Sequence, residues 1–548
     1  MPPETHEVFN QPPPLVDYDT FAADVVLQEA IARGAASSWA PAELHELGIL
    51  AGSEQARSWG EQANANPPQL KVFDRYGHRI DQVEYHPAYH DLMRSAIAHG
   101  LHAWPWADAR SGAHAARAAK MLTWYTVDSG HTCPVSMTYA VLPALRHQPD
   151  LASEWEPRLV SRVYDERYAP ATEKAGVTCG MGMTEKQGGS DVRANTTAAV
   201  PLDDGTYAIT GHKWFCSAPM SDAFLVLAQA PRGLSCFLVP RWRPDGTPNV
   251  FRLQRLKDKL GDRSNASSEV EFVNTFAQLV GEEGRGVRTI IEMVNHTRLD
   301  CSLGSASIMR RATVEAIWHA QHRTAFGKLL VEQPLMGNVL ADLAIESEAA
   351  TTTVMWLADL FDADGREHDE RAAALQRLAL PVVKYWTCKR APVHAAEALE
   401  CLGGAGFIEE SGLPRLFRQS PLNGIWEGSG NVICLDVLRA MARSPESVEV
   451  LFDELNEAAG ADRRLADAVE DVSKQLADLS EPEWMARRLV ERLALALQGS
   501  LLVRFGDQAV ADAFCSTRLA GDHGQTFGSL PTGTDATRIV GRHLTLSS

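Results

Sequence analysis

Residues 425–431 combine residue types that could support acid–base chemistry. Glu427 stands between Trp426 and Gly428, and the apolar helical run 432–441 follows directly. A carboxylate between an aromatic ring and a glycine-rich turn could be a catalytic base held over a planar cofactor. It could equally mark a helix start, because the helix dipole stabilises a glutamate near a helix N-terminus and Gly, Ser and Asn are common capping residues.

A second candidate is the glycine-rich sequence Met-Gly-Met-Thr-Glu-Lys-Gln-Gly-Gly-Ser-Asp-Val at residues 181–192. Two glycines followed by a serine let backbone N–H groups and a hydroxyl approach a diphosphate closely, and Thr184 could bond a ring heteroatom. The alternative is a plain turn between strands. Neither the Rossmann fingerprint nor the P-loop pattern is present, so those modes of phosphate binding do not apply.

Two adjacent aromatic residues occur in the sequence Gly-His-Lys-Trp-Phe-Cys-Ser at residues 211–217. Aromatic side chains beside a hydroxyl could line a flat ring system, although neighbouring aromatics also pack in ordinary sheets. His212 has no partner pattern for a metal site or a catalytic triad. Because G-x-S-x-G, H-E-x-x-H and spaced His/Cys clusters are also missing, the sequence predicts neither a hydrolase nor a metal site.

Composition limits the remaining classes of protein. A chain of 548 residues, 45% apolar and 22% charged, predicts three or four globular domains. Its net charge of −18 disfavours a broad nucleic-acid or anionic-membrane surface, although a local basic patch could survive. The nine cysteines include no C-x-x-C pair, as expected of buried thiols in a reducing compartment. Without a signal-like start or a long apolar run, we expect a cytoplasmic protein with no membrane contact.

The first third of the chain predicts an arm followed by helices. Residues 1–35 are rich in proline and polar side chains, which favours an extended arm. Residues 36–174 have helical spacing in patches such as 113–125. Residues 175–283 then alternate with period two between glycine, proline and Asp-Gly turns, which predicts a small antiparallel sheet or barrel.

The rest of the chain returns to helical periodicity. Residues 284–442 predict a helical bundle with breaks at Pro381, Pro392 and the glycine pair 403–404, and residues 443–548 predict a further helical extension. The fold class is therefore mainly α with a central β-domain.

Six blocks taken together carry more information than any one motif. Residues 184–192, 211–217, 257–261, 323–330, 402–407 and 426–429 resemble, in order and approximate spacing, the acyl-CoA dehydrogenase family over roughly residues 85–442. Residues 5–12, 183–192 and 256–267 and the C-terminal extension are similar to the AidB-like branch of that family, which is linked to the adaptive response to DNA alkylation.

The resemblance implies a fold and a cofactor. The family fold consists of a helical domain, a β-barrel-like domain and a four-helix bundle, with a C-terminal helical domain added in this branch. FAD lies between the β-domain and the bundle, and the family is oligomeric, so a homotetramer built as a dimer of dimers is expected. By resemblance, the FAD-binding residues are Met181, Met183, Thr184, Gly189, Ser190, Phe215, Cys216, Ser217, Arg323, Phe326, Gly404, Trp426, Gly428, Ser429 and Asn431.

By the same resemblance, Glu427 is the catalytic base of an FAD-dependent oxidoreductase acting on acyl-CoA. It would remove the α-proton of an acyl thioester while the β-carbon gives hydride to flavin N5, and a water-poor site would strengthen the base. In one branch of the family the base precedes an arginine in the first bundle helix. Those positions are Thr297 and Arg298 here, and a threonine cannot act as the base, so they remain candidates for substrate contact only.

Three departures from the family limit the expected activity. The usual glutamine near the cofactor is Glu400, the usual lysine before the catalytic loop is Pro421, and the N-terminal arm would crowd the CoA position. FAD binding is therefore expected more firmly than efficient turnover of acyl-CoA.

An alternative function is binding of double-stranded DNA through the C-terminal extension, with a largely vestigial dehydrogenase site. The candidate contacts are Arg439, Arg443, Arg487, Arg488 and Arg518. Acidic residues outnumber basic ones beyond residue 443, so a solvated and partly paired helical surface explains the same arginines. An arginine stripe on one face could still bind phosphates.

Overall fold

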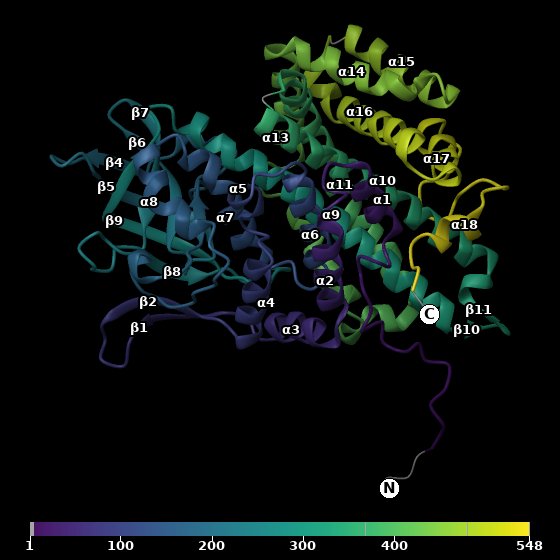
Figure 1. Cartoon of the computed structure of the whole chain (residues 1–548), viewed down its shortest axis with the longest axis horizontal. Coiled ribbons are helices and arrows are strands. Elements are labelled where there is room, and N and C mark those ends of the chain that lie inside the picture. The colour runs from purple at the N-terminus through teal and green to yellow at the C-terminus, as the bar shows by residue number, and fades with distance from the viewer. Residues whose placement is uncertain (1–4, 368, 479, 547–548) are drawn as a thin grey trace. The chain divides into compact units, whose positions relative to one another are not determined.

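The computed structural model describes residues 5–367, 369–478 and 480–546, which form two compact units. Unit 1 comprises Met1–Glu54, His114–Thr126 and Cys301–Ser548, and unit 2 comprises Gln55–Ala113 and Val127–Asp300. The first four residues of the expected arm and the last two of the expected C-terminal extension lie outside the described residues. Unit 1 unites segments far apart in sequence, whose purple, blue and green-to-yellow colours can be followed in Figure 1, and local periodicity cannot reveal this.

Unit 2 contains the β-structure, apart from one short hairpin. Apart from the first residue of α3, its elements are α3 (Glu54–Ala65), β1 (Gln69–Phe73), β2 (Arg79–Glu84), α4 (Pro87–Ala98), α5 (Trp104–Ala107), α7 (Thr132–Leu145), α8 (Pro149–Leu159), β3 (Cys179–Gly182), β4 (Ala198–Pro201), β5 (Tyr207–Ser217), β6 (Ala223–Ala230), β7 (Gly233–Pro240), β8 (Arg252–Leu256) and β9 (Ser267–Val280). The antiparallel hairpin β1–β2 lies within residues 36–174, where sequence analysis predicted a helical domain and no strands. Its strands alternate between exposed and half-buried residues, a weak signal beside the helical patches around it.

The strands β4, β5, β9, β7 and β6 form a closed ring. Each pairs with the next in that order, and β6 pairs back with β4 through Ala198 and Gln229. β3 joins β6 in parallel, and β8 joins β9 antiparallel. The predicted small barrel is therefore present, and closure leaves few unpaired strand edges.

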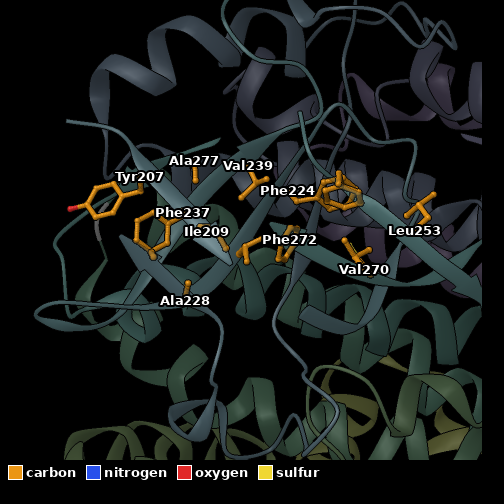
Figure 2. Packing of buried hydrophobic residues seen from close by; sticks show 14 of the residues in the cluster. Tyr207, Ile209, Phe224, Ala228, Phe237, Val239, Leu253, Val270, Phe272 and Ala277 are labelled. Carbon is orange, nitrogen blue, oxygen red and sulfur yellow. The ribbon is translucent and has the colours of Figure 1, made fainter. Parts of the chain in front are cut away.

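Aromatic and branched side chains fill the interior of this barrel (Figure 2). Tyr207 and Ile209 point inward from alternate positions of β5, and Phe224 stacks on Phe251 with ring centroids 4.8 Å apart. Each such side chain contributes about 1.5–3 kcal/mol by leaving water. Two stretches that sequence analysis singled out belong to this region: residues 211–217 lie in β5, and the glycine-rich loop follows β3.

Unit 1 is helical. Apart from the first residue of α6, its elements are α1 (Val25–Arg33), α2 (Ala40–Gly52), α6 (Ala113–Tyr125), the hairpin β10 (Thr324–Ala325) and β11 (Lys328–Leu329), α10 (Pro334–Glu367), α11 (Glu370–Cys401), α12 (Leu413–Gln419), α13 (Gly430–Arg443), α14 (Pro445–Ala459), α15 (Arg463–Ala477), α16 (Pro482–Phe505), α17 (Gln508–Phe514) and α18 (Ala536–Gly541). The long helix α9 (Gly286–His322) belongs to unit 2 up to Asp300 and to unit 1 from Cys301.

Two local predictions fail in unit 1. The expected extended arm ends before residue 35, because Asp24 caps α1 by accepting a hydrogen bond from the N–H of Leu27. The expected breaks at Pro381 and Pro392 are missing, because α11 continues through both prolines to Cys401. Pro381 is buried with the apolar residues around it, so packing in the bundle offsets the lost backbone hydrogen bonds.

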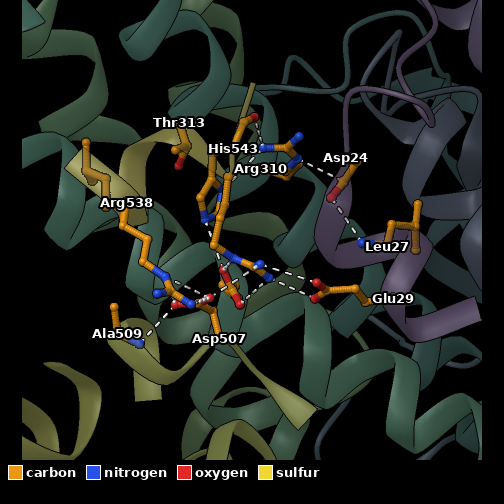
Figure 3. Close-up of polar contacts among 12 residues, drawn as sticks. Asp24, Leu27, Glu29, Arg310, Thr313, Asp507, Ala509, Arg538 and His543 are labelled. Atoms are coloured by element: carbon orange, nitrogen blue, oxygen red, sulfur yellow. Dashed lines mark hydrogen bonds and ion pairs between the residues drawn. The ribbon is translucent and has the colours of Figure 1, made fainter. Parts of the chain in front are cut away.

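Buried ion pairs tie the C-terminal extension to the bundle (Figure 3). Arg310 of α9 donates to Asp24 at 2.8 Å and to the backbone oxygen of His543 at 2.5 Å. Arg542 and His543 of the extension reach Glu348 of α10 at 3.1 and 3.4 Å. The end of the expected C-terminal extension is therefore built into unit 1.

In the part of the chain that the structure describes, every helix is too short or too polar to cross a membrane.

Candidate functional site

Glu427 lies in the loop between α12 and α13, and its backbone is left-handed. Its φ is +58°, a conformation that costs a non-glycine residue of order 1 kcal/mol or more. Gly428 follows with φ +112°, and a Cβ there would lie 2.9 Å from Cδ1 of Ile433. Only glycine fits after Glu427, and such strain persists only where the surroundings hold the backbone.

The alternative interpretation of Glu427 as part of a helix start loses its support. α13 begins at Gly430 with Ser429 as its N-cap, and its first turn contains no acidic residue. Glu427 thus precedes the helix instead of stabilising its first turn. One of its carboxylate oxygens is buried while the residue as a whole is half-exposed. That combination suits a base that must meet a substrate.

Asn423 fixes the loop against two helices. This residue is 1% exposed, its Oδ1 accepts a hydrogen bond from Nε1 of Trp426 at 2.9 Å, and its Nδ2 donates to the hydroxyl of Tyr125 at 3.2 Å. Gly304 of α9 makes room for this contact, because a Cβ there would lie 2.6 Å from the Tyr125 ring. The position of Trp426, and with it the loop, is therefore set by α6 and α9.

Lys384 of α11 holds the backbone on both sides of Glu427. Its Nζ donates to the carbonyl oxygen of Trp426 at 2.9 Å and to that of Gly428 at 2.5 Å. The side chain is 1% exposed. Sequence reasoning missed Asn423, Tyr125 and Lys384, because each lies in or beside a helical run whose periodicity predicts only packing.

Two of the four residues after Glu427 are exposed to solvent. Ser429 and Asn431 are exposed, and Oδ1 of Asn431 accepts a hydrogen bond from Nε of Arg487 at 2.8 Å. Gly404 is exposed, and a Cβ there would meet open space. Glu400 is also exposed, so its carboxylate is solvated.

The hairpin β10–β11 carries Arg323 and Phe326 at its edges. Arg323 donates to the backbone oxygen of Asn10 in the N-terminal arm at 2.5 Å. Phe326 is 100% exposed with φ +53°. A fully exposed aromatic ring on a strained turn is the kind of side chain that a second subunit or a ligand covers.

In unit 2, the glycine-rich loop folds around a buried ion pair. Lys213 of β5 donates to Glu185 at 2.8 Å, and neither side chain is exposed. Burial alone would raise the pKa of Glu185, but hydrogen bonds from Lys213, Thr196 and Thr197 more than offset it and hold that pKa below its ordinary value. This buried ion pair therefore attaches the glycine-rich loop to strand β5. Sequence reasoning did not predict the pair.

The two glycines of this loop permit a close approach. Gly188 has φ +147°, and a Cβ on Gly189 would lie 2.4 Å from Oγ1 of Thr184. Ser190 is exposed beside them, while Met181 and Met183 are half-buried at the strand end. Thr184, Gly189 and Ser190, which sequence analysis selected, therefore lie together on one turn, in which Ser190 is exposed.

Strand β5 bears the aromatic candidates. Its register against β9 shifts between Lys213 and Cys216, and a bulge of this kind re-aims side chains. Phe215 is 49% exposed, and Ser217 is half-buried with its hydroxyl 3.1 Å from that of Ser267. Cys216 points the other way into the barrel core, where burial raises the pKa of its thiol to about 12. The Cys216 side chain therefore faces away from any ligand on the outer side of β5, and only the backbone of Cys216 remains a candidate for contact with the cofactor.

Thr297 and Arg298 lie on the unit 2 part of α9 and are both buried. The Thr297 hydroxyl donates to the backbone oxygens of Met293 and Val294 at 3.3 and 3.1 Å. It bonds its own helix, so this position offers no second base.

The arginines considered for DNA fall into two groups. Arg439, Arg443 and Arg488 are exposed, and Arg487 is exposed but bonded to Asn431. Arg518 instead forms ion pairs with Asp342 and Glu346 of α10, and its side chain is 10% exposed. Its guanidinium is part of the ion-pair network within unit 1, so we no longer consider Arg518 a candidate for DNA contact.

All nine cysteines are buried, as predicted. Among the described residues, no group of three or more His, Cys, Asp or Glu side chains is arranged to hold a metal ion.

Family models match three successive parts of the chain. Residues 10–166 match the adaptive response protein AidB N-terminal domain, residues 180–275 the acyl-CoA dehydrogenase middle domain, and residues 284–442 the acyl-CoA dehydrogenase C-terminal domain. The AidB protein of Escherichia coli (strain K12) is 45% identical over 518 residues, which cover 94% of this chain and 95% of that protein. The chain belongs to the acyl-CoA dehydrogenase family.

Other relatives agree with this assignment. Acyl-CoA dehydrogenase family member 11 of Caenorhabditis elegans is 30% identical over 507 residues, covering 86% of this chain and 81% of that protein. A crystal structure of Caenorhabditis elegans ACDH-11 in complex with C11-CoA superposes with a TM-score of 0.87 at 26% identity, covering 98% of this chain and 97% of that one. Family membership confirms the predicted fold class and the AidB-like resemblance, and makes the chain an oxidoreductase of an FAD-dependent family.

Proposed function

We propose that this protein removes hydrogen from the α and β carbons of an acyl-CoA thioester, with Glu427 as the base. The observation that carries the proposal is the left-handed Glu427, which precedes α13 and is fixed by Asn423 and Lys384. Strain of this kind concentrates at functional sites. The related ACDH-11 structure contains C11-CoA, which supports an acyl-CoA substrate here.

The chain's own residues fit FAD. Gly189 lets Thr184 pack closely against the turn, since a Cβ there would lie 2.4 Å from the threonine Oγ1, and Ser190 beside them is exposed, while the exposed ring of Phe215 offers a flat apolar surface. In unit 1, Ser429 and Asn431 are exposed, as is Gly404, and they remain candidates for FAD contacts, while Arg323 and Phe326 would contact FAD bound to a neighbouring subunit of a homotetramer. FAD, when bound, supplies the hydride acceptor at N5.

Glu427 performs the protein's part of the reaction. Its carboxylate would take the α-proton, and the electron pair of that C–H bond would form the new double bond, with the bound FAD supplying the acceptor for the β-hydride. One oxygen of the carboxylate is buried and therefore shielded from water. At the family's alternative position for the base stands Thr297, whose hydroxyl bonds its own helix and cannot act as a base.

The test is a flavin-reduction screen without oxygen across acyl-CoA chain types. In wild-type protein reconstituted with FAD, at least one acyl-CoA thioester should bleach the flavin absorbance. Glu427→Gln should retain flavin and lose bleaching by a factor of about 10²–10⁴, the usual contribution of a general base. Glu410→Gln, which changes an exposed glutamate, is the matched control. Bleaching of Glu427→Gln at the wild-type rate would remove Glu427 from this role.

A second candidate function, binding of double-stranded DNA, is favoured by one surface. Arg439, Arg443, Arg488 and Arg492 are exposed on α13 and α16, and across the described residues no carboxylate lies within ion-pair distance of them. Unpaired arginines can contact phosphates, although α14 beside them is rich in glutamate.

Salt dependence tests this second function. Duplex DNA should bind the wild-type protein with an affinity that falls steeply as salt rises, and the combined change of Arg439, Arg443 and Arg488 to glutamine should reduce the salt slope by about 2–3. An unchanged slope, or no binding at low salt, would eliminate it.

A further inference from the structure

Lys384 makes a contact that an ordinary buried lysine does not make. Buried ammonium groups usually pair with a carboxylate, because an isolated buried charge is costly. Within residues 5–367, 369–478 and 480–546, no carboxylate lies within ion-pair distance of Lys384. Its two acceptors are the carbonyl oxygens of Trp426 and Gly428, at 2.9 and 2.5 Å. The charge is therefore committed to the backbone around Glu427.

The two acceptors stand on either side of the strained residue. Bonding the carbonyl of Trp426 fixes the peptide plane that leads into Glu427, and bonding the carbonyl of Gly428 fixes the plane two peptides later. Between these planes lie the left-handed Glu427 at φ +58° and Gly428 at φ +112°. A single donor group thus restricts the dihedral angles that aim the Glu427 carboxylate.

The other end of the lysine is equally fixed. Lys384 lies in the interior of α11, where its neighbours Val382, Val383 and Tyr385 are all buried. The ammonium therefore acts from a rigid helix and not from a flexible surface chain. Hydrogen bonds from a charged donor are stronger than neutral ones.

We propose that Lys384 is a positioning residue for proton removal. Its ammonium holds residues 426–428 in the strained conformation, so that the Glu427 carboxylate is already aligned when a substrate arrives. It does not touch the substrate. This inference rests on the proposed function of Glu427.

Lys384→Met tests the role, because methionine fills similar space without a donor. In the flavin-loaded full chain, the rate constant for flavin reduction by an acyl-CoA that bleaches the wild type should fall about 10- to 100-fold, since misplacement of a catalytic group by about 1 Å has effects of this size. Binding of the corresponding 3-thia-acyl-CoA, which cannot lose hydride from the position taken by sulfur, should change less than about threefold. Lys474→Met, which removes an exposed ammonium paired with Glu470, should change neither quantity.

Local exchange provides a readout besides activity. Backbone N–H groups of residues 425–429 should exchange with solvent faster in Lys384→Met, while flavin content and the melting temperature stay near those of the wild type. A folded variant that reduces flavin at the wild-type rate overturns the proposal. So does a variant in which only binding of the 3-thia analogue weakens.

A second variant covers the case in which Lys384→Met does not fold. Lys384→Gln keeps two N–H donors on a shorter, neutral side chain, and its reduction rate should fall between those of wild type and Glu427→Gln. A wild-type rate in this variant overturns the proposal. Failure of the underlying function is distinguishable, because then Glu427→Gln itself bleaches normally or no acyl-CoA reduces the wild-type flavin.

Discussion

Arg487 of α16 donates a hydrogen bond from Nε to Oδ1 of Asn431 at 2.8 Å. Asn431 follows Glu427 by four residues, so the C-terminal extension directly contacts the segment that carries the candidate base. A guanidinium nitrogen of Arg487 also approaches within 3.3 Å of the position that a Cβ on Gly430 would take. An arginine considered for DNA from sequence thus bonds the start of α13 instead.

The first prediction concerns this contact. Arg487→Gln should raise hydrogen exchange of residues 425–432 about two- to tenfold, because a hydrogen bond of this kind contributes about 0.5–1.5 kcal/mol. The exchange is measured by mass spectrometry of the flavin-loaded protein. Arg488→Gln, the neighbouring exposed arginine, is the control. Equal exchange in the two variants would show that the extension does not stabilise the loop.

The sequence predicted long periodic elements well. Residues 113–125 coincide with α6, and the alternating runs around Tyr207 and Phe272 lie in barrel strands. The failures come from tertiary packing: α11 crosses Pro381 and Pro392 because its neighbours bury it, and β1–β2 is too short and too exposed to show a clear period. A proline predicts a helix break only where nothing else stabilises the helix.

The candidate site was predictable where residues lie close together in sequence. Thr184, Gly189 and Ser190 share one turn, and family resemblance gave Glu427 its role. Lys384 could not be found in this way, because 42 residues separate it from its acceptor on Trp426 and a lysine within a helical run predicts an exposed side chain. Contacts between distant segments have no local pattern.

The second prediction concerns the buried pair under the glycine-rich loop. Lys213→Met should lower the free energy of unfolding by about 3–5 kcal/mol, because it leaves the Glu185 carboxylate buried without its cation. Urea unfolding followed by flavin fluorescence measures this change. The double change of Lys213→Met with Glu185→Gln should recover part of the loss. Lys474→Met breaks an exposed pair and should cost less than about 1 kcal/mol. Equal costs for both lysines would contradict the prediction.

The third prediction concerns the approach of the loop backbone to a ligand. Gly189→Ala places a Cβ 2.4 Å from Oγ1 of Thr184, so the threonine or the turn must move. We expect the dissociation constant for FAD to rise at least about tenfold, which corresponds to about 1.4 kcal/mol. Gly460→Ala is the control, because that glycine has open space around it. Unchanged FAD affinity in Gly189→Ala, measured by titration of the apoprotein, would argue against this turn as the diphosphate site.

The fourth prediction concerns the stability of the bundle in acid. Nε2 of His394 in α11 lies 3.2 Å from the hydroxyl of Thr313 in α9 and 3.1 Å from the backbone oxygen of Leu343 in α10. His394 therefore connects three helices of the bundle. Burial lowers the pKa of His394 to about 4 from the ordinary 6.5. Between pH 6.5 and about 4, His394 is therefore protonated in the unfolded chain but neutral in the folded chain. Stability that is present above pH 6.5 is lost as the pH falls toward 4.

The size and origin of this loss can both be measured. A shift from 6.5 to about 4 corresponds to at most about 3 kcal/mol, of which about 2 kcal/mol should be lost between pH 6.5 and 5. Glu346, whose pKa of about 2 is lowered mainly by Arg390 and Arg518 against its burial, titrates below this window and does not interfere. His394→Gln keeps a hydrogen-bond donor and cannot titrate. Its free energy of unfolding should fall less steeply than that of the wild type between pH 6.5 and 5, and parallel curves would show that His394 is not the titrating group.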